Sequence, residues 1–265
     1  MWKELSNGNH KGAYRDEGKG KVVVLIHGFG EDGTVWENQQ AYLSTYFRVI
    51  VPDLPGSGKS PLADVSMENM AAFIHAILIQ EQIVQVTMIG HSMGGYVALA
   101  FADKHPEMLQ GFGLFHSTAR PDTEEKKEGR RKSIRMIEQY GAEAFLTQTL
   151  PNMFSNSYRQ AQPDRVDEYI RRGLELDSKS LIAYYEAMIQ RPDRTAVLED
   201  TKVPVLFFIG KDDTAVPPES VLPLVTIPRV SSVHIFEKVA HMGLWEVYED
   251  SNILLHQFVT FCQQS

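Results

Sequence analysis

The chain has 265 residues, of which 43% are hydrophobic and 23% are charged, and its formal net charge is −8. This length and composition are typical of one large globular domain with a sizeable core and room for an insertion. The negative charge argues against general binding to nucleic acid or to anionic membranes. Because Cys262 is the single cysteine, the chain can form no internal disulfide and no cysteine-based metal site.

The beginning of the chain, from Met1 to Leu5, opens a polar stretch without the hydrophobic region of a secretory signal. No apolar segment approaches the length that spans a membrane. We therefore expect a soluble, cytoplasmic protein with no membrane partner. The sequence does not indicate an oligomeric state.

Short apolar runs that resemble strands alternate along the chain with amphipathic segments that resemble helices. This alternation predicts an α/β fold built from parallel β–α–β units, and the continuously apolar strands indicate helices on both faces of a mostly parallel sheet. Strands are expected at residues 13–15, 21–26, 47–52, 85–89, 110–115, 203–209 and 232–237, and core helices at 34–46, 66–82, 93–104 and 245–262.

The pattern changes between residues 117 and 196, where strand-like runs disappear and polar, helix-forming sequence takes over. Prolines punctuate this region, as helix start and stop signals do. The charged run from Glu124 to Lys132 mixes both signs and is most simply a solvated helix face. We predict an all-helical insertion with helices at 122–139, 142–149, 164–176 and 178–190.

The most informative motif is the pentapeptide Gly90–Gly94, which stands between an apolar run ending at Ile89 and a helix-like segment that includes Tyr96. The pattern predicts a strand, a tight turn and a helix with Ser92 at the apex. So sharp a turn crowds the serine, and the residues two before and two after it must lack side chains. The same pentapeptide also suits an ordinary strand-to-helix connection, so its chemistry depends on the rest of the chain.

A serine hydroxyl becomes a good nucleophile when a base takes its proton and a third group orients that base. An acid loop follows the buried strand-like run that ends at Gly210, and presents Asp212 and Asp213 at a strand end. His241 lies in a loop of small residues ahead of the last helical segment, as a general base requires. The chain thus offers serine, acid and histidine in this order.

These motifs resemble those of the α/β-hydrolase superfamily along nearly the whole chain, and five of them occur in the expected order. They are the oxyanion loop at His27–Gly30, the D-x-x-G-x-G-x-S segment at Asp53–Ser60, the nucleophile elbow at Gly90–Gly94, the acid loop at Gly210–Pro217 and the histidine loop at Ala240–His241.

The resemblance implies that Ser92 is the nucleophile, that His241 is the general base and acid, and that Asp213 orients and charges the histidine. It also implies that the backbone N–H groups of Phe29 and Met93 form the oxyanion hole. Fixed donors, one of them at a helix N-terminus, suit the negative charge that develops on a carbonyl oxygen. No metal or cofactor is expected.

The resemblance further implies that residues 1–116 and 197–265 form the hydrolase core and that residues 117–196 form a helical lid over the pocket. The aromatic and methionine side chains of the lid either line an acyl or alcohol site or simply dock the lid on the core. These side chains are Phe145, Met153, Phe154, Tyr184, Tyr185 and Met188.

Competing residues exist for the base and for the acid. His234 and His256 also follow the acid loop, but the first lies inside an apparent strand and the second inside the last helix. Asp212 adjoins Asp213, and the three-residue offset from Gly210 favours Asp213. Asp212 is then a solvated or capping carboxylate.

Three more histidines lie near the motifs. His91 adjoins the serine, but the side chains of adjacent residues on a tight turn diverge, which favours packing beside the elbow. His27 is expected to shape the oxyanion turn. His116 closes a strand-like run and faces the same end of the sheet, so a place in the pocket wall stays open for it.

The segment Gly56–Ser60 resembles a phosphate-binding loop at first sight. Such a loop needs a glycine five residues before the glycine of the Gly-Lys-Ser triplet, and that position is Asp53. We therefore reject a nucleotide site and expect a turn after the strand that ends at Pro52.

The expected reaction is acyl transfer to water, with a small-molecule carboxylic ester as substrate and an acyl-enzyme as intermediate. A serine at the elbow weighs against the family's dehalogenases and epoxide hydrolases, which place an aspartate there. Three alternatives stay open: a carbon–carbon bond hydrolase or lactonase with the same triad, a perhydrolase or cofactor-free haloperoxidase, and a non-catalytic ligand receptor. The first alternative needs polar groups of the lid, for which Arg120, Arg130, Arg131 and Arg191 are available.

Overall fold

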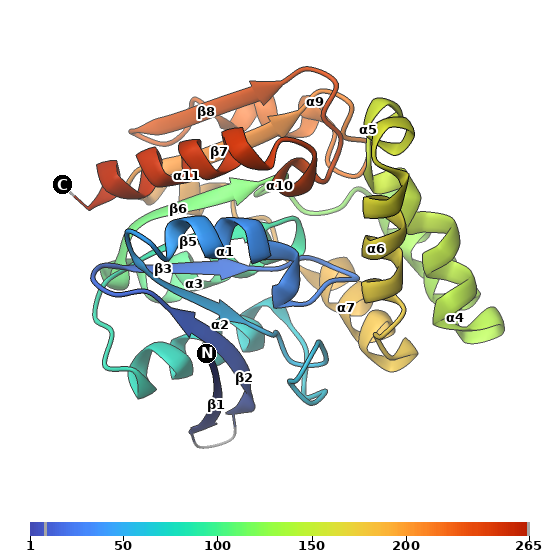
Figure 1. The fold of residues 1–265 in the computed structure, drawn as a ribbon, viewed down its shortest axis with the longest axis horizontal. Coiled ribbons are helices and arrows are strands. Elements are labelled where there is room, and N and C mark those ends of the chain that lie inside the picture. Colours follow the sequence, from blue (N-terminus) through green and yellow to red (C-terminus); the bar gives the residue numbers. More distant parts are fainter. Residues whose placement is uncertain (8–9, 264–265) are drawn as a thin grey trace.

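The computed structural model describes residues 1–7 and 10–263 of the chain. Its centre is an eight-stranded sheet of order β1-β2-β4-β3-β5-β6-β7-β8 (Figure 1). The β1–β2 and β2–β4 pairs are antiparallel, and all other pairs are parallel. The mostly parallel α/β sheet is therefore confirmed. The strands are β1 (Trp2–Asn7), β2 (His10–Glu17), β3 (Val22–Ile26), β4 (Arg48–Pro52), β5 (Val86–His91), β6 (Leu109–Phe115), β7 (Val205–Gly210) and β8 (Ser231–Phe236).

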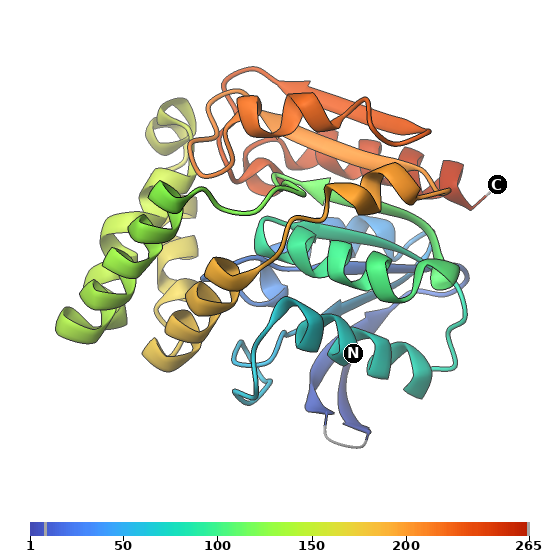
Figure 2. The same ribbon diagram turned by 180° about the vertical axis from the view of Figure 1, so that it is seen from behind.

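Helices cover both faces of this sheet. α1 and α11 lie together on one face, and α2 and α3 lie together on the other (Figures 1 and 2). Every residue of β3, β5 and β7 is buried, which is why these strands are largely apolar. The helices of this part are α1 (Glu37–Leu43), α2 (Met67–Gln80), α3 (Met93–Lys104), α9 (Pro218–Val221), α10 (Gly243–Glu246) and α11 (Tyr248–Cys262).

Two helices that the sequence predicts as continuous are interrupted. A 3₁₀ turn, Gly33–Trp36, occupies the start of the segment expected at 34–46, and α1 follows it. Val247 has non-helical angles, φ −133° and ψ 50°, and separates α10 from α11 within the segment expected at 245–262. Hydrophobic periodicity continues through such breaks, so it does not reveal them.

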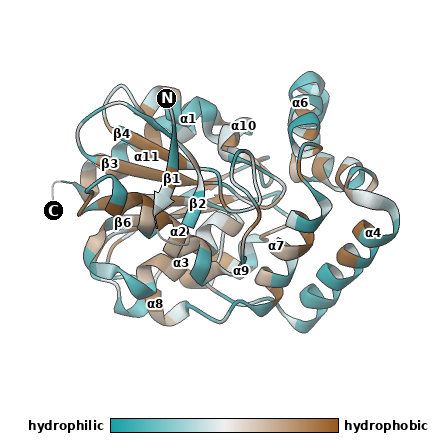
Figure 3. Cartoon of the chain, turned by 90° about the horizontal axis from the view of Figure 1, so that it is seen from below, coloured by the Kyte–Doolittle hydropathy of each residue, from teal (hydrophilic) through white to brown (hydrophobic). Residues whose placement is uncertain are grey.

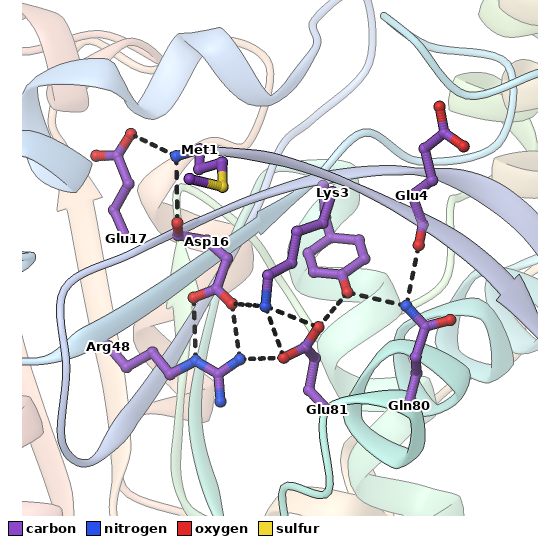
Figure 4. Close-up of polar contacts among 9 residues, drawn as sticks. Met1, Lys3, Glu4, Asp16, Glu17, Arg48, Gln80 and Glu81 are labelled. Atoms are coloured by element: carbon purple, nitrogen blue, oxygen red, sulfur yellow. Dashed lines mark hydrogen bonds and ion pairs between the residues drawn. The ribbon is translucent and has the colours of Figure 1, made fainter.

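The sequence did not predict β1, because its first residues read as polar. In the structure Lys3 of β1 and Arg48 of β4 both form ion pairs with Asp16 and Glu81 (Figure 4). Burial raises the pKa of Glu81, but Lys3, the Tyr14 hydroxyl and Arg48 outweigh burial and hold that pKa below its usual range. The charge of Lys3, which helped to make this stretch resemble a loop, is thus paired with carboxylates that come later in the chain.

A purely helical segment lies between β6 and β7, beyond the arrowheads of the parallel strands (Figure 1). Its longest helix, α4, is broken at Gly141, where φ is 85° and ψ is 165°, and this is where the sequence predicted a break. The sequence missed the short helices α5 and α8. The helices are α4 (Glu124–Thr149), α5 (Asn156–Ala161), α6 (Pro163–Gly173), α7 (Ser178–Gln190) and α8 (Thr195–Asp200).

Hydropathy divides the molecule in the same way. Apolar residues concentrate in the strands of the sheet, whereas α4 and α6 are largely hydrophilic (Figure 3). Across residues 1–7 and 10–263, no helix combines the length and the apolar character that crossing a bilayer requires.

Candidate active site

Ser92 stands at the turn between β5 and α3 with φ 51° and ψ −116°, a conformation that side-chain-bearing residues rarely adopt. A Cβ atom on Gly90 would lie 2.1 Å from the Gly94 carbonyl oxygen, and one on Gly94 would lie 2.4 Å from the Ile26 carbonyl oxygen. Both glycines are therefore required by the backbone itself. The steric reason that the sequence motif indicated is present in the fold.

Hydrogen bonds from β6 and the following loop hold this turn. The Ser92 N–H donates to the Phe115 carbonyl at 2.9 Å, and the Ser117 hydroxyl donates to the Ser92 carbonyl at 2.7 Å. Within the described part of the chain, the Ser92 hydroxyl has no hydrogen-bond partner in the protein, and the residue lines a cavity of about 380 Å³. The hydroxyl is thus presented to the cavity on a rigid support.

Asp213 lies in the loop after β7 and is buried, and its carboxylate accepts four hydrogen bonds. Oδ1 accepts the N–H groups of Ala215 and Val216 at 2.9 and 2.8 Å. Oδ2 accepts Nδ1–H of His241 at 2.8 Å and Nδ1–H of His116 at 3.0 Å. Burial raises the pKa of Asp213, but His241 and the bonds from both histidines outweigh burial and hold that pKa well below its usual range.

The neighbouring carboxylate, Asp212, is exposed to solvent. His241 is buried in the loop between β8 and α10 and lines the same cavity as Ser92. The other two histidines considered as bases lie elsewhere: His234 bonds to Ser232 within β8, and His256 stacks on Tyr46 from α11. Among these residues, the fold brings Ser92, Asp213 and His241 together.

Two backbone donors lie close to Ser92. Met93 is the first residue of α3, and Phe29 follows β3 in the adjacent loop. Within the ranges the structure describes, neither backbone N–H has a hydrogen-bond partner in the protein. His27 supports this loop, because its Nε2 accepts the Leu54 N–H at 3.0 Å and its Nδ1 donates to the Gly28 carbonyl at 2.9 Å. The two orphan donors suit an anionic oxygen.

Comparison with known proteins places this geometry in a family. The family model described as the alpha/beta hydrolase fold matches residues 21–247 of the chain. The chain belongs to this family.

Relatives of the alpha/beta hydrolase family differ in how much of the chain they match. A thermophilic esterase from Thermogutta terrifontis, solved with malate bound, is 28% identical with a TM-score of 0.92, over 99% of each chain. The 2-hydroxy-6-oxononadienedioate/2-hydroxy-6-oxononatrienedioate hydrolase of Burkholderia vietnamiensis is 27% identical over 275 residues, 93% of this chain and 90% of that protein. An uncharacterized protein of Mycobacterium tuberculosis is 40% identical over 102 residues, which cover 38% of this chain and 30% of that protein.

This alpha/beta hydrolase contains a buried ion pair beside the elbow that sequence analysis missed. Glu31 accepts the Gly28 N–H at 2.6 Å and the Tyr169 hydroxyl at 3.1 Å, and lies 3.0 Å from Nδ1 of His91. Burial alone raises the pKa of Glu31 and lowers that of His91, but their attraction outweighs burial and reverses both directions. His91 also donates from Nε2 to the His241 carbonyl at 3.0 Å. It packs beside the elbow, as expected, and supports the histidine loop.

Sequence analysis left open whether His116 lies in the pocket wall, and in the structure it does not. It stands behind Asp213 and is not among the residues that line the cavity. His116, Asp213 and His241 have ligand atoms within 4.8 Å of one another, the spacing that a metal ion needs. The same atoms form the hydrogen bonds just described, so a bound cation would replace the pairing of Asp213 with His241.

The helical segment supplies much of the cavity wall, including Lys126, Arg130, Met153, Tyr185 and Met188. The run Glu124–Lys132 is therefore not a purely solvated face: one turn of α4 points its cations inward. The other candidate pocket residues of this segment do not line the cavity. They are buried in the core, and they are Phe145, Phe154 and Tyr184.

The inward cations share one buried carboxylate. Arg130 and Arg191 contact Asp122 at 2.5 and 2.9 Å, and the Lys126 ammonium lies 4.0 Å from it. Burial raises the pKa of Asp122, but these cations outweigh burial and lower that pKa. Three cations around one anion leave an excess of positive charge at this wall of the cavity.

The rejected nucleotide motif is a turn. Asp53 accepts the N–H groups of Gly33 and Lys59 at 3.0 and 2.8 Å, and the Ser60 hydroxyl donates to the Asp53 carbonyl at 2.6 Å. The aspartate that occupies the position of a missing glycine therefore organises the loop after β4.

Proposed function

We propose that this protein is a serine hydrolase that cleaves a small-molecule carboxylic ester. The observation that carries the proposal is the buried Asp213–His241 pair at the wall of the same cavity as the strained Ser92. In this proposal Ser92 Oγ attacks the ester carbonyl while His241 Nε2 takes its proton. Asp213 holds the histidine in the tautomer that leaves Nε2 free.

The developing oxyanion is stabilised by the N–H groups of Phe29 and Met93, which have no other partner in the described chain. His241 then gives its proton to the leaving alcohol, and Ser92 carries the acyl group. A water activated by His241 attacks this acyl-enzyme and releases the acid. The sequence of steps needs no metal or cofactor.

We further propose that residues 117–196 act as a lid over this site. The His241 N–H donates to the Met153 carbonyl at 2.9 Å, and the Phe29 ring stacks on Tyr185 with centroids 4.2 Å apart. The segment thus contacts both the histidine loop and the oxyanion loop, so movement of the lid would alter both.

A second candidate is a carbon–carbon bond hydrolase that uses the same triad. The excess positive charge of Lys126 and Arg130 at the cavity wall favours a substrate with a carboxylate. The Burkholderia vietnamiensis relative carries a dioate in the name of its substrate. The esterase from Thermogutta terrifontis, at 28% identity and 99% coverage, supports the first candidate.

The deciding experiment measures hydrolysis of p-nitrophenyl esters from acetate to palmitate, with Ser92→Ala as the blank. Serine-dependent turnover with an optimum in chain length supports the ester hydrolase. If a 2-hydroxy-6-oxodienoate is cleaved and the esters are not, the carbon–carbon bond hydrolase replaces the ester hydrolase as the proposed function. Ligand retention without any Ser92-dependent turnover contradicts both and favours a receptor.

The lid cations are tested with two esters of equal length, p-nitrophenyl butyrate and mono-p-nitrophenyl succinate. Preference for the succinate that disappears in Lys126→Met supports recognition of a carboxylate. Lys132→Met is the matched control, because Lys132 is an exposed cation of the same helix outside the cavity.

A further inference from the structure

Asp213 is contacted by two histidines rather than one, and both donate to the same oxygen, Oδ2. We infer that His116 is a positioning residue: its N–H fixes the Asp213 carboxylate and shares its negative charge, and thereby sets how strongly His241 holds a proton. The inference rests on the proposed triad of Ser92, His241 and Asp213.

The fold is built around the His116 ring. His116 follows β6 with φ 51°, in the left-handed region, and its backbone N–H donates to the Phe208 carbonyl of β7 at 2.9 Å. A Cβ atom on Gly243 would lie 2.5 Å from His116 Nε2, and one on Gly210 would lie 2.9 Å from its Cε1. Side chains at these two glycines would displace the ring, so the acid loop and the start of α10 both leave room for it.

The protonation state of His116 follows from its surroundings. Burial lowers the pKa of His116 to about 4, against the opposing pull of Asp213 and in the same direction as His241 and His91. The ring is therefore neutral near pH 7. Because an ionised carboxylate can only accept, the single ring proton lies on Nδ1 and is donated to Asp213.

This tautomer also accounts for the other ring nitrogen. His116 Nε2 is buried and has no hydrogen-bond partner within the described residues. Without a proton it is an unpaired acceptor, as is required when the proton of a neutral ring sits on Nδ1. Within the described residues, the one hydrogen bond of the ring is therefore the bond to Asp213.

The bond between His116 and Asp213 changes how Asp213 interacts with His241. With His116 present, Oδ2 divides its hydrogen-bonding capacity between two donors, and Oδ1 is held by two backbone N–H groups. Without His116, Oδ2 loses one of its two donors, and His241 becomes the one side chain that donates to the Asp213 carboxylate within the described residues. His241 then holds its proton more strongly, so the imidazolium is a weaker acid towards the leaving alcohol. At a given pH a smaller share of the enzyme also carries the unprotonated His241 that can accept the Ser92 proton.

The test compares His116→Phe, which keeps an aromatic ring but removes the donor, with His116→Asn, whose amide can donate from nearly the position of Nδ1. In His116→Phe we expect kcat to fall about ten- to hundredfold with KM within about twofold of wild type, as for loss of a hydrogen bond to a charged group. The acid limb of the profile of kcat/KM against pH moves to higher pH. In His116→Asn we expect most of the wild-type kcat to be recovered and the acid limb to return to its wild-type position.

Three outcomes overturn the inference. The first is a His116→Phe variant with wild-type kcat, and the second is a His116→Phe variant whose pH profile is unshifted; each contradicts a positioning role. Equal loss in His116→Asn and His116→Phe, with the melting temperature lowered in both, assigns the ring to packing alone. If His116→Phe does not fold, His116→Leu replaces it as the variant without a donor.

A second readout separates this inference from the proposed ester substrate. The rate at which a p-nitrophenyl alkylphosphonate labels Ser92 depends on the triad but not on the natural substrate. Labelling in wild type that slows about tenfold or more in His116→Phe and recovers in His116→Asn supports the inference even if no ester is hydrolysed. Absence of Ser92 labelling in wild type contradicts the triad itself, and the inference falls with it.

Discussion

Two clusters of charge in this molecule, one half-buried and one buried, are organised in opposite ways. At the antiparallel edge of the sheet, two cations and two carboxylates pair reciprocally, and Lys3 and Arg48 each contact both acids (Figure 4). At the opposite end of the parallel strands, Asp213 alone receives four donors and His116 Nε2 has no partner in the described chain.

The backbone differs between the two clusters as well. Ser92 and His116 both adopt positive φ, whereas Lys3 and Arg48 lie within regular strands. Strained backbone and incompletely paired buried groups cost stability, and they persist where the surrounding fold enforces them. We therefore expect the edge cluster to stabilise the fold and the Asp213 cluster to serve the proposed reaction. Mutations should separate the two properties.

The largest effect is expected for Ser92→Ala. Loss of the nucleophile should lower kcat/KM by about four orders of magnitude or more, because the remaining site cannot form the acyl-enzyme. The melting temperature should not fall, since the variant removes only a hydroxyl without protein hydrogen bonds in the described chain. Steady-state kinetics and thermal unfolding check both statements, and a variant with near wild-type esterase activity would exclude Ser92 as nucleophile.

A slightly smaller loss is expected for Asp213→Asn. An amide that donates to His241 reverses the tautomer of the imidazole, and kcat should fall by about three to four orders of magnitude. Asp212→Asn is the matched control, because this neighbour is exposed, and its kcat should stay within about twofold of wild type. The assignment of the acid is wrong if Asp212→Asn is the more damaging change.

Arg48→Met tests the edge cluster. The change leaves Asp16 and Glu81 with Lys3 as their remaining cation, and we expect unfolding free energy to fall by about 1–2 kcal/mol with kcat unchanged. Lys211→Met breaks a more exposed pair with Glu237 and should cost less, about 0.5 kcal/mol. Urea unfolding measures both, and a loss of activity in Arg48→Met would contradict the separation.

The remaining effect concerns the pH dependence of stability. His116 has a pKa of about 4 in the folded protein and about 6.5 when unperturbed, so between these values the unfolded chain binds a proton that the folded chain does not. Its contribution to stability is therefore complete above pH 6.5 and declines as pH falls towards 4. We expect the difference in unfolding free energy between pH 7 and pH 5 to be about 2 kcal/mol larger in wild type than in His116→Asn.

This pH comparison uses a difference because other groups titrate in the same range. Glu31 and Asp213, whose folded pKa values are lowered, also lose stability on acidification, whereas His91, with a raised pKa, retains it. These contributions are present in both proteins and cancel to first order. Equal slopes in wild type and His116→Asn would show that His116 titrates in the folded state as it does in the unfolded chain.

The sequence by itself predicted the local turns, and these turns indicated many residues of the candidate site. The glycines around Ser92 are needed because a Cβ on Gly90 would collide with the Gly94 carbonyl within the turn, and a Cβ on Gly94 would collide with the Ile26 carbonyl of the neighbouring strand. A turn of this shape against this strand always meets both constraints, so they leave a motif in the sequence. The alternation of apolar strands with helices likewise indicated the sheet and the helical segment, since burial on both faces shows in composition. Spacing from Gly210 pointed to Asp213 rather than the exposed Asp212.

The tertiary structure alone decided which distant groups meet. His116 and Asp213 are 97 positions apart, Glu31 and His91 are 60 apart, and Lys3 and Glu81 are 78 apart. These pairs depend on strand order and on how loops turn at the sheet's ends, and neither leaves a periodic trace. In the sequence, a histidine or glutamate that will be buried cannot be told apart from one that will be exposed. Its ion pair or hydrogen bond depends on a partner far along the chain, and only the fold brings that partner into contact.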